Sequence, residues 1–337
     1  MKLPSEHPHI PKPKVGVLLI NLGTPDRTDY FSMRRYLNEF LSDKRVIEVP
    51  AFLWQPILKL IILTVRPKKS GKLYDKIWNK KQNESPLRIN TRLQAEQLSK
   101  SSHRNVVVEW AMRYGNPSIK DKINILLEKG CTKILFFPLY PQYSATTTAS
   151  VMDKIYEALK FIRWQPSIRM VPPFYDEKIY IETIVESIKS HIKKLNWKPD
   201  ALLCSFHGIP KKYFIKGDPY HCHCVKTKRL IEEKLKKNIH SVELSFQSRF
   251  GPQEWLKPYM NDKFDELIKK RKKKICVIAP GFVSDCLETL EEISIQGEKD
   301  FLEQGGTHFS YIPCLNNQKN STKMLNILIN KELAGWI

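Results

Sequence analysis

A histidine placed directly after an apolar run is the first residue that could do chemistry. His207 follows the apolar residues 201–204, and Gly208 comes next, which allows a tight turn. An imidazole can bind a divalent metal ion or accept a proton near pH 7. A lone histidine is more often structural, but the end of a predicted strand would turn this one toward a cleft.

A row of carboxylates follows a second apolar run, residues 275–280. Asp285, Glu288 and Glu292 are spaced i, i+3 and i+7, so on an α-helix they share one face. Acidic residues also favour the first turn of ordinary surface helices, because of the helix dipole. In a chain of net charge +21 we interpret the row as a cation path or a proton relay. Together with His207 it suits either transient Fe²⁺ binding or general base catalysis.

A third group of donors lies in His221, Cys222, His223 and Cys224. Such donors could bind Zn²⁺ or part of an iron–sulfur cluster, but no second Cys-x-x-Cys lies at a usable spacing. No glycine-rich nucleotide motif of the G-x-G-x-x-G or Walker A type occurs, which argues against nucleotide dependence.

The elements that must position these residues alternate between short apolar runs and amphipathic stretches of helical length. The runs 15–20, 106–110, 134–138, 201–205, 242–246 and 275–280 predict buried parallel strands. The stretches 117–128, 151–161, 179–195, 226–237 and 255–269 predict helices. This alternation predicts an α/β fold with parallel sheets flanked by helices.

The order of the strand-end motifs repeats in the two halves of the chain. Residues 18–25, 110–115 and 133–138 correspond to residues 202–210, 246–251 and 274–280. We therefore expect two similarly built α/β domains, residues 13–175 and 176–320, with a C-terminal helix over 321–337 packed back on the first. Ligands of such folds lie at the carboxyl ends of the strands, so the active site is expected in the cleft between the domains.

An insertion at about residues 30–86 of the first domain, called the lip below, combines basic and apolar residues. Arg34, Arg35, Arg66 and Lys72 are interleaved with an apolar run over residues 51–65. The run could be a helix packed on its own domain, the wall of a site for a large flat ligand with carboxylates, or a contact with an acidic membrane. Nucleic acid is not favoured, because no nucleic-acid-binding motif is evident.

Length and composition bound the remaining possibilities. The chain has 337 residues, enough for two domains, and an odd number of cysteines, seven, which favours reduced thiols in a cytosol. Residues 1–14 lack the apolar core of a signal peptide. The run 51–65 is too short for a bilayer span and contains Pro56 and Lys59. We expect a cytoplasmic protein that contacts the inner face of a membrane at most peripherally.

Several of these stretches together resemble one family, the ferrochelatases. The most specific are residues 202–210, 216–220, 246–252 and 254–256, followed by the acidic row 285–292. Residues 21–25, 36–43 and 138–144 are also similar to the family, and the similarity runs from Val15 to about Asn320. The resemblance implies a chelatase-like fold of two Rossmann-like domains with a porphyrin held between them.

The resemblance also implies a reaction, the insertion of Fe²⁺ into protoporphyrin IX with loss of two pyrrole protons, giving protoheme. It assigns metal and proton roles to His207 and Glu288, and Asp285 and Glu292 would extend the acidic relay. On the porphyrin side it implies contacts from three residues of the lip: Arg66, Tyr74 and Ser85.

Two departures from the family and three alternatives accompany this assignment. Cys286 stands where animal members have histidine, and the Cys-rich tail that holds a [2Fe–2S] cluster in some relatives is absent. We therefore expect no permanently bound cofactor, with Fe²⁺ as a substrate.

The alternatives are a coproporphyrin III ferrochelatase, another tetrapyrrole metal chelatase, and a heme-binding protein without activity, in which His207 would be an axial ligand.

Overall fold

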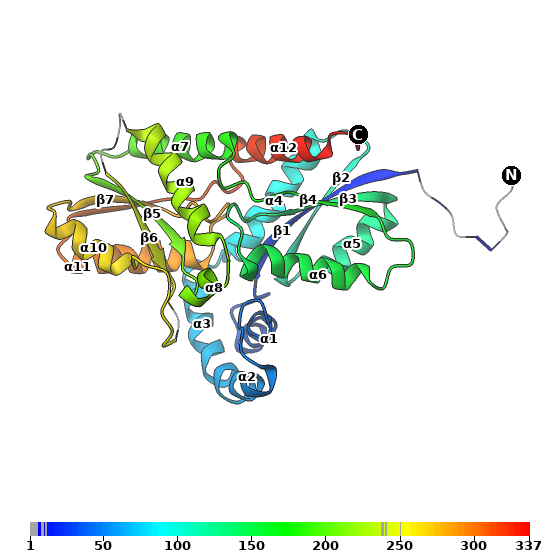
Figure 1. Ribbon diagram of the computed structural model, residues 1–337, viewed down its shortest axis with the longest axis horizontal. Helices are drawn as coiled ribbons and strands as arrows, with labels where there is room; N and C mark the ends of the chain where they lie inside the picture. Colours follow the sequence, from blue (N-terminus) through cyan, green and yellow to red (C-terminus); the bar gives the residue numbers. More distant parts are fainter. Residues whose placement is uncertain (1–5, 8–9, 11, 237–238, 240, 250) are drawn as a thin grey trace.

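Two four-stranded parallel sheets form the body of the molecule in the computed structural model (Figure 1). The structure describes residues 6–7, 10, 12–236, 239, 241–249 and 251–337. Phe250 and most of the N-terminal segment considered above lie outside these residues. The predicted α/β class with parallel sheets flanked by helices is confirmed.

The first sheet has the strand order β2-β1-β3-β4. Its strands are β1 (Lys14–Thr24), β2 (Val106–Gly115), β3 (Cys131–Pro138) and β4 (Ser167–Met170). The apolar runs form its centre because both faces are covered, and Val17, Leu18, Leu19 and Ile20 are fully buried. The helices α4 (Pro86–Ser101), α5 (Ile119–Glu128), η2 (Ala145–Ala149) and α6 (Ser150–Leu159) belong to this half.

The second sheet repeats this topology with the order β6-β5-β7-β8. Its strands are β5 (Ala201–His207), β6 (Val242–Gln247), β7 (Lys274–Ile278) and β8 (His308–Ile312). Its helices are α7 (Lys178–Ile192), α8 (Lys211–Ile215), α9 (Tyr220–Leu235), α10 (Met260–Lys269), η3 (Glu288–Gly297) and α11 (Glu298–Glu303). In both halves the first strand is central and pairs with the next two in sequence.

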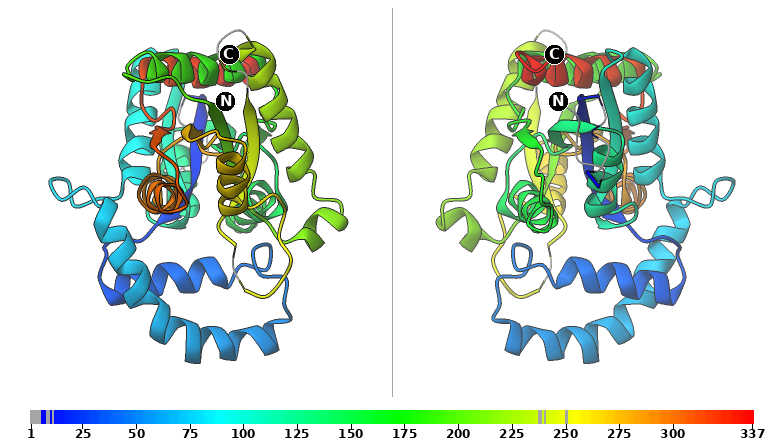
Figure 2. Two further views of the ribbon diagram at one scale, coloured as in Figure 1. Left: turned by 90° about the vertical axis from the view of Figure 1, so that its left-hand side faces the viewer. Right: turned by 90° about the vertical axis from the view of Figure 1, so that its right-hand side faces the viewer.

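The lip projects from the body on the side opposite α7 and α12 (Figures 1 and 2). It contains α1 (Tyr30–Leu41), then α2 (Ala51–Ile57), the π-helical turn η1 (Leu58–Ile62) and α3 (Leu63–Ile77). Pro56 lies inside α2, and the π turn follows directly, as is common where a proline removes a helix hydrogen bond. Met33, Tyr36, Leu58, Leu63 and Tyr74 pack together inside the lip.

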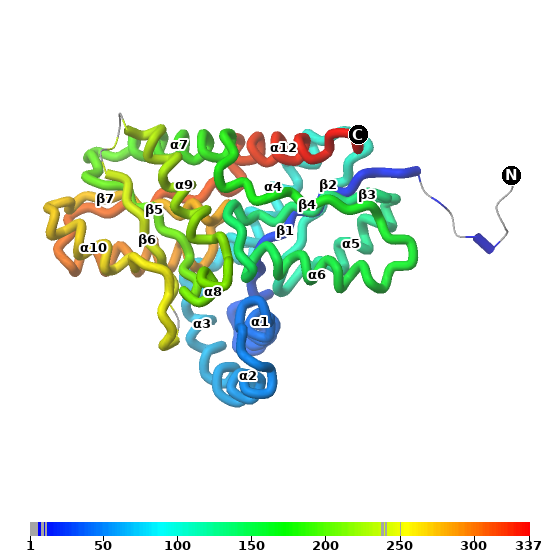
Figure 3. The backbone as a smooth tube through the Cα atoms, in the orientation of Figure 1, coloured from blue at the N-terminus to red at the C-terminus, as the bar shows by residue number. Residues whose placement is uncertain are grey.

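The last helix, α12 (Lys319–Leu333), contacts α4 and β3 of the first half and α7 of the second, and the tube in Figure 3 shows it beside α7. Arg169 of β4 donates to the carbonyls of Glu332 and Ala334 at 2.6 and 2.9 Å, and its guanidinium stacks over Trp336. The C-terminal segment thus packs against both halves of the molecule.

Candidate active site

His207 is the last residue of β5, where its backbone pairs with Gln247 of β6. Its Nδ1 lies 2.6 Å from the carbonyl oxygen of Gly208, and since a carbonyl can only accept, Nδ1 donates here, so that in the neutral imidazole Nε2 carries the lone pair. Gly208 is required for close approach, because a Cβ there would lie 2.9 Å from the carbonyl oxygen of Gln247. The strand end therefore presents a half-buried imidazole whose Nε2 can bind a metal ion or accept a proton.

The carboxylates lie on a π-helix, not on the α-helix that their spacing predicts. The π segment η3 begins at Glu288, and its wider turn brings residues four to five apart above one another. Glu288 and Glu292 therefore share a face, whereas Asp285 precedes the helix. Gln247 donates from Nε2 to the carbonyl oxygen of Glu288 at 2.7 Å and so ties this helix to the end of β6.

Glu292 is held by Ser248, the residue that follows β6. The Ser248 amide donates to Glu292 Oε1 at 2.7 Å, and the Ser248 hydroxyl donates to Oε2. Ser248 takes the left-handed conformation, with φ of 67°, which is unusual for a residue with a side chain and typical of functional sites. Burial raises the pKa of Glu292; the hydrogen bonds from Ser248 and the charge of His207 oppose the rise, and the charge of Glu288 adds to it. The charges of His207 and Glu288 therefore both act on the Glu292 carboxylate.

Asp285 does not join that group, which corrects the expectation that it shares a helix face with Glu288 and Glu292. Its buried carboxylate accepts from the Thr289 hydroxyl at 2.9 Å, from the Tyr311 hydroxyl at 2.7 Å and from Asn316 Nδ2 at 2.6 Å. The Cys314 amide donates to it at 3.3 Å. These bonds fix the turn that leads into η3.

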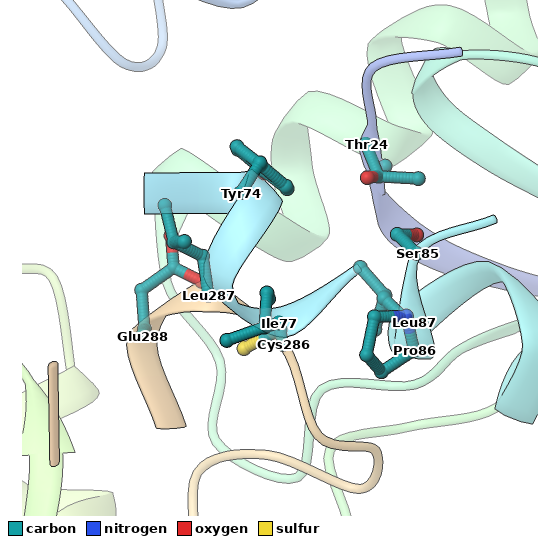
Figure 4. Close-up of a pocket in the computed structure, with 10 residues that line it drawn as sticks. Thr24, Tyr74, Ile77, Ser85, Pro86, Leu87, Cys286, Leu287 and Glu288 are labelled. Carbon is teal, nitrogen blue, oxygen red and sulfur yellow. The ribbon is translucent and has the colours of Figure 1, made fainter. Parts of the chain in front are cut away.

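Tyr74 and Ser85 of the lip line one pocket together with Glu288 (Figure 4). In Figure 4, Tyr74 and Glu288 lie on one side of the pocket, and Thr24 and Ser85 lie on the other. Burial raises the pKa of the Tyr74 hydroxyl, and the charge of Glu288 adds to the rise. Ser85 caps α4, with its hydroxyl accepting from the Arg88 amide at 3.2 Å. Two of the three expected porphyrin contacts thus line the same pocket as Glu288.

Arg66 lies apart from this pocket, although it belongs to the same helix as Tyr74. The side chain is half-buried, and burial lowers the pKa of its guanidinium. A cation partly withdrawn from water in this way is suited to pairing with an anionic group.

Sequence reasoning did not find the network around Asp43, which fixes the base of the lip. Its carboxylate accepts from Arg113 Nη2 at 2.6 Å, from the Tyr114 hydroxyl at 2.7 Å and from the Ser150 hydroxyl at 2.5 Å. Burial opposes ionisation, but the bonds from Ser150 and Tyr114 keep the pKa of Asp43 below its usual value. The signal in the sequence was that Asp43 ends the stretch 36–43, which was already noted as similar to the family.

The four donors at the start of α9 point in different directions. Cys224 is buried and Cys222 is exposed. His223 stacks on Tyr175, with ring centroids 3.7 Å apart, and its Nδ1 accepts from the Tyr143 amide, while His221 stacks on Phe246. Over the described residues, no three side chains of His, Cys, Asp or Glu are grouped so as to hold a metal ion.

Comparison with known proteins identifies one family over nearly the whole chain. A family model described as Ferrochelatase matches residues 14–333. A protein of Rhizobium etli named ferrochelatase is 54% identical over 336 residues, covering 99% of this chain and 98% of that protein. A protein of the same name from Allorhizobium ampelinum is 55% identical over 337 residues, covering 99% of this chain and 98% of that protein. Another from Brucella anthropi is 54% identical over 327 residues, covering 96% of this chain and 93% of that protein.

Solved structures support the fold at low sequence identity. SirB from Bacillus subtilis with Fe³⁺ superposes with a TM-score of 0.59 at 11% identity, covering 96% of each chain. The sirohydrochlorin chelatase SirB of Bacillus subtilis subspecies spizizenii in complex with cobalt gives a TM-score of 0.52 at 10% identity over 94% of each chain. These structures confirm the predicted chelatase-like arrangement of two Rossmann-like domains.

Proposed function

The chain belongs to the ferrochelatase family, and from that premise we propose that it inserts Fe²⁺ into protoporphyrin IX at this site, the last step of heme synthesis. In this lyase reaction the metal ion replaces the two pyrrole protons of the free porphyrin. The observation that carries the proposal is geometric: Gln247, which pairs with His207 across β5 and β6, ties the start of η3 to the end of β6, and Glu288 at that start lines one pocket with Tyr74 of the lip.

The chemistry requires one group that binds iron and others that remove two protons. His207 Nε2 and the Glu288 carboxylate share these tasks, since each can bind Fe²⁺ or accept a proton. Glu292, whose pKa is raised, is a stronger base than an ordinary carboxylate and would pass protons onward from Glu288. Asp285 would act by holding the turn before Glu288, because its carboxylate is occupied by structural hydrogen bonds.

The lip would supply the binding of the porphyrin. Ile77 and Leu287 offer apolar surface in the pocket, while Tyr74 and Ser85 offer hydroxyls. Arg66 would pair with a propionate, since its half-buried cation suits an anionic ligand. A flat porphyrin hides its nitrogens in its own plane, and binding it bent exposes their lone pairs at a cost of ~1–5 kcal/mol, which the contacts of the lip would offset.

The test is metal insertion by the purified protein under anaerobic conditions. Protoporphyrin IX or coproporphyrin III is incubated with Fe²⁺ or Zn²⁺, and the absorption and fluorescence of the metalloporphyrin are followed. We expect turnover with protoporphyrin IX exceeding that with coproporphyrin III. Turnover with coproporphyrin III alone would show that coproporphyrin III, and not protoporphyrin IX, is the substrate. Porphyrin binding without turnover would show that the protein binds heme or porphyrin but is not an enzyme.

We also propose that the lip contacts the inner, acidic face of a membrane peripherally, from the cytoplasm. Phe52, Leu60 and Ile61 are 76, 73 and 61% exposed on the projecting lip (Figure 2). A groove of about 300 Å³ lined by Arg34, Arg35 and Lys59, among other residues, adds positive charge. Apolar side chains beside basic groups suit an anionic bilayer surface. No helix within the described part of the chain is both long and apolar enough to span a bilayer.

Sedimentation with vesicles tests the membrane contact. We expect binding to vesicles that contain phosphatidylglycerol and weak binding to phosphatidylcholine alone. The variant F52S/L60S should reduce binding at least about tenfold, because each large apolar side chain that enters the bilayer is worth ~1.5–3 kcal/mol. F161S removes an 81% exposed phenylalanine outside the lip and is the matched control. Equal loss in both variants, or no loss in either, would refute this orientation.

A further inference from the structure

A long-range ion pair joins the lip to the helix that carries the carboxylates. Lys76 Nζ of α3 donates to Glu291 Oε1 of η3 at 2.7 Å, across a sequence separation of 215 residues. The Glu291 side chain is only 10% exposed, whereas that of Lys76 is 47% exposed.

The two residues lie next to the groups proposed to bind the porphyrin and to catalyse metal insertion. Lys76 lies between Tyr74 and Ile77, which line the pocket from the lip side. Glu291 lies three residues after Glu288 and directly before Glu292. A change in the relative position of α3 and η3 would therefore change the width of the pocket.

The exposure of the two partners makes the pair asymmetric. Lys76 can exchange Glu291 for water at little cost, because nearly half of its side chain is already exposed. Glu291 cannot, because its carboxylate is buried, and a buried carboxylate without a partner is strongly disfavoured. The carboxylate therefore holds the lip in place.

Over the described residues, the other hydrogen bonds between the lip and the second half of the molecule involve Tyr213 and Lys216 and are different in kind. The Tyr213 hydroxyl donates to the carbonyl oxygen of Val46 at 3.0 Å, and Lys216 pairs with Glu48 at 2.5 Å. The side chain of Lys216 is 63% exposed and that of Glu48 is 28% exposed, so both partners of this pair are more exposed than those of the first.

We propose that the Lys76–Glu291 pair is a positioning latch, which fixes α3 against η3 and so sets the geometry in which the pocket holds a porphyrin. This role rests on the proposed function, since it concerns the same pocket. The pair acts through Tyr74 and Glu288 and does not itself contact the reacting atoms.

The test compares K76M, E291Q and the double variant with the matched control K216M. Porphyrin binding is measured by quenching of tryptophan fluorescence with protoporphyrin IX, and KM and kcat are measured in the insertion assay. We expect K76M and E291Q each to raise the Kd and KM for porphyrin on the order of tenfold, with the KM for the metal ion unchanged. The double variant should be no worse than either single variant, K76R should restore porphyrin binding, and K216M should behave as wild type.

The outcomes separate the latch from the proposed function and from a loss of folding. Unchanged porphyrin Kd in K76M, additive losses in the double variant, or an equal loss in K216M would overturn the latch. Wild-type binding of porphyrin without turnover would overturn the proposed function alone. Hydrogen exchange reports on the folded protein directly: amides of α3 should exchange faster in K76M while those of β5 keep the wild-type rate.

Discussion

The replacement of Asp285 by asparagine distinguishes a structural carboxylate from a member of a proton relay. In the structure, Asn316 donates from Nδ2 to Asp285 Oδ2 at 2.6 Å, while Asn316 Oδ1 accepts from the Asp285 amide at 2.8 Å. The Asn316 amide therefore cannot flip without losing its second bond. In one orientation, the NH₂ group of an asparagine at position 285 would face the NH₂ group of Asn316. In the other, it would replace the oxygen that accepts from Thr289, Tyr311 and the Cys314 amide.

The magnitude follows from what is lost. One hydrogen bond to a buried charged group is worth ~1.5–3 kcal/mol, and a buried donor left without a partner costs a further ~1–3 kcal/mol. We expect D285N to destabilise the protein by about 3 kcal/mol, which lowers Tm by about 4 °C for a chain of this length. The variant D285N/N316D should recover part of this loss, because the carboxylate then faces the new amide.

Thermal unfolding followed by circular dichroism, together with the insertion assay, decides the matter. E288Q is the matched control, because we expect it to unfold near the wild-type temperature while losing turnover. D285N should show the opposite pattern, with a lowered Tm and a kcat that remains within severalfold of wild type below the unfolding transition. A D285N protein that unfolds as wild type does but has lost turnover would refute the structural role and restore the relay.

Three further predictions follow from other contacts. The fold raises the pKa of Glu292 above its ordinary 4.5, so ionising this carboxyl group destabilises the folded protein. The Tm of wild type should therefore fall relative to the Tm of E292Q as pH rises from about 4 to 7. A difference in Tm between the two proteins that does not change with pH would contradict this. D43N leaves the Arg113 guanidinium, whose side chain is 10% exposed, without its counter-charge. The free energy of unfolding measured by denaturant titration should fall by ~3–5 kcal/mol. Little change would show that the network is dispensable. K216M breaks a largely exposed pair and should cost at most ~1 kcal/mol in the same titration; a larger loss would mean that this contact anchors the lip.

The central strands and the edge strands β2 and β6 were predictable from the sequence, whereas the edge strands β4 and β8 were not. The runs that became β1, β3, β5 and β7 are apolar because helices cover both faces of the sheets. The edge strands β4 and β8 are four and five residues long, mostly half-buried or exposed, and carry polar residues, so no hydrophobic pattern marks them. The predicted helix over 255–269 begins only at Met260, because Pro258 disfavours helical geometry before it.

The residues of the site were more predictable than their geometry. His207 and Glu288 were marked by their positions after apolar runs, which the parallel sheet converts into neighbouring strand ends. The π-helix was not predictable, because residue spacing alone cannot distinguish i→i+4 from i→i+5 hydrogen bonding. Ser248, Asp43 and the Lys76–Glu291 pair depend on contacts between distant segments, which no local pattern records.

The central claim is that His207 and Glu288 perform metal insertion in a pocket that the lip completes, and one paired measurement tests it most directly. For H207A and E288Q, formation of protoheme from Fe²⁺ and protoporphyrin IX is measured alongside the Kd for protoporphyrin IX. We predict loss of turnover in both variants with porphyrin binding within about threefold of wild type, since the removed groups serve iron and protons and leave the lip intact. Near-normal turnover in either variant would contradict the assignment of the site.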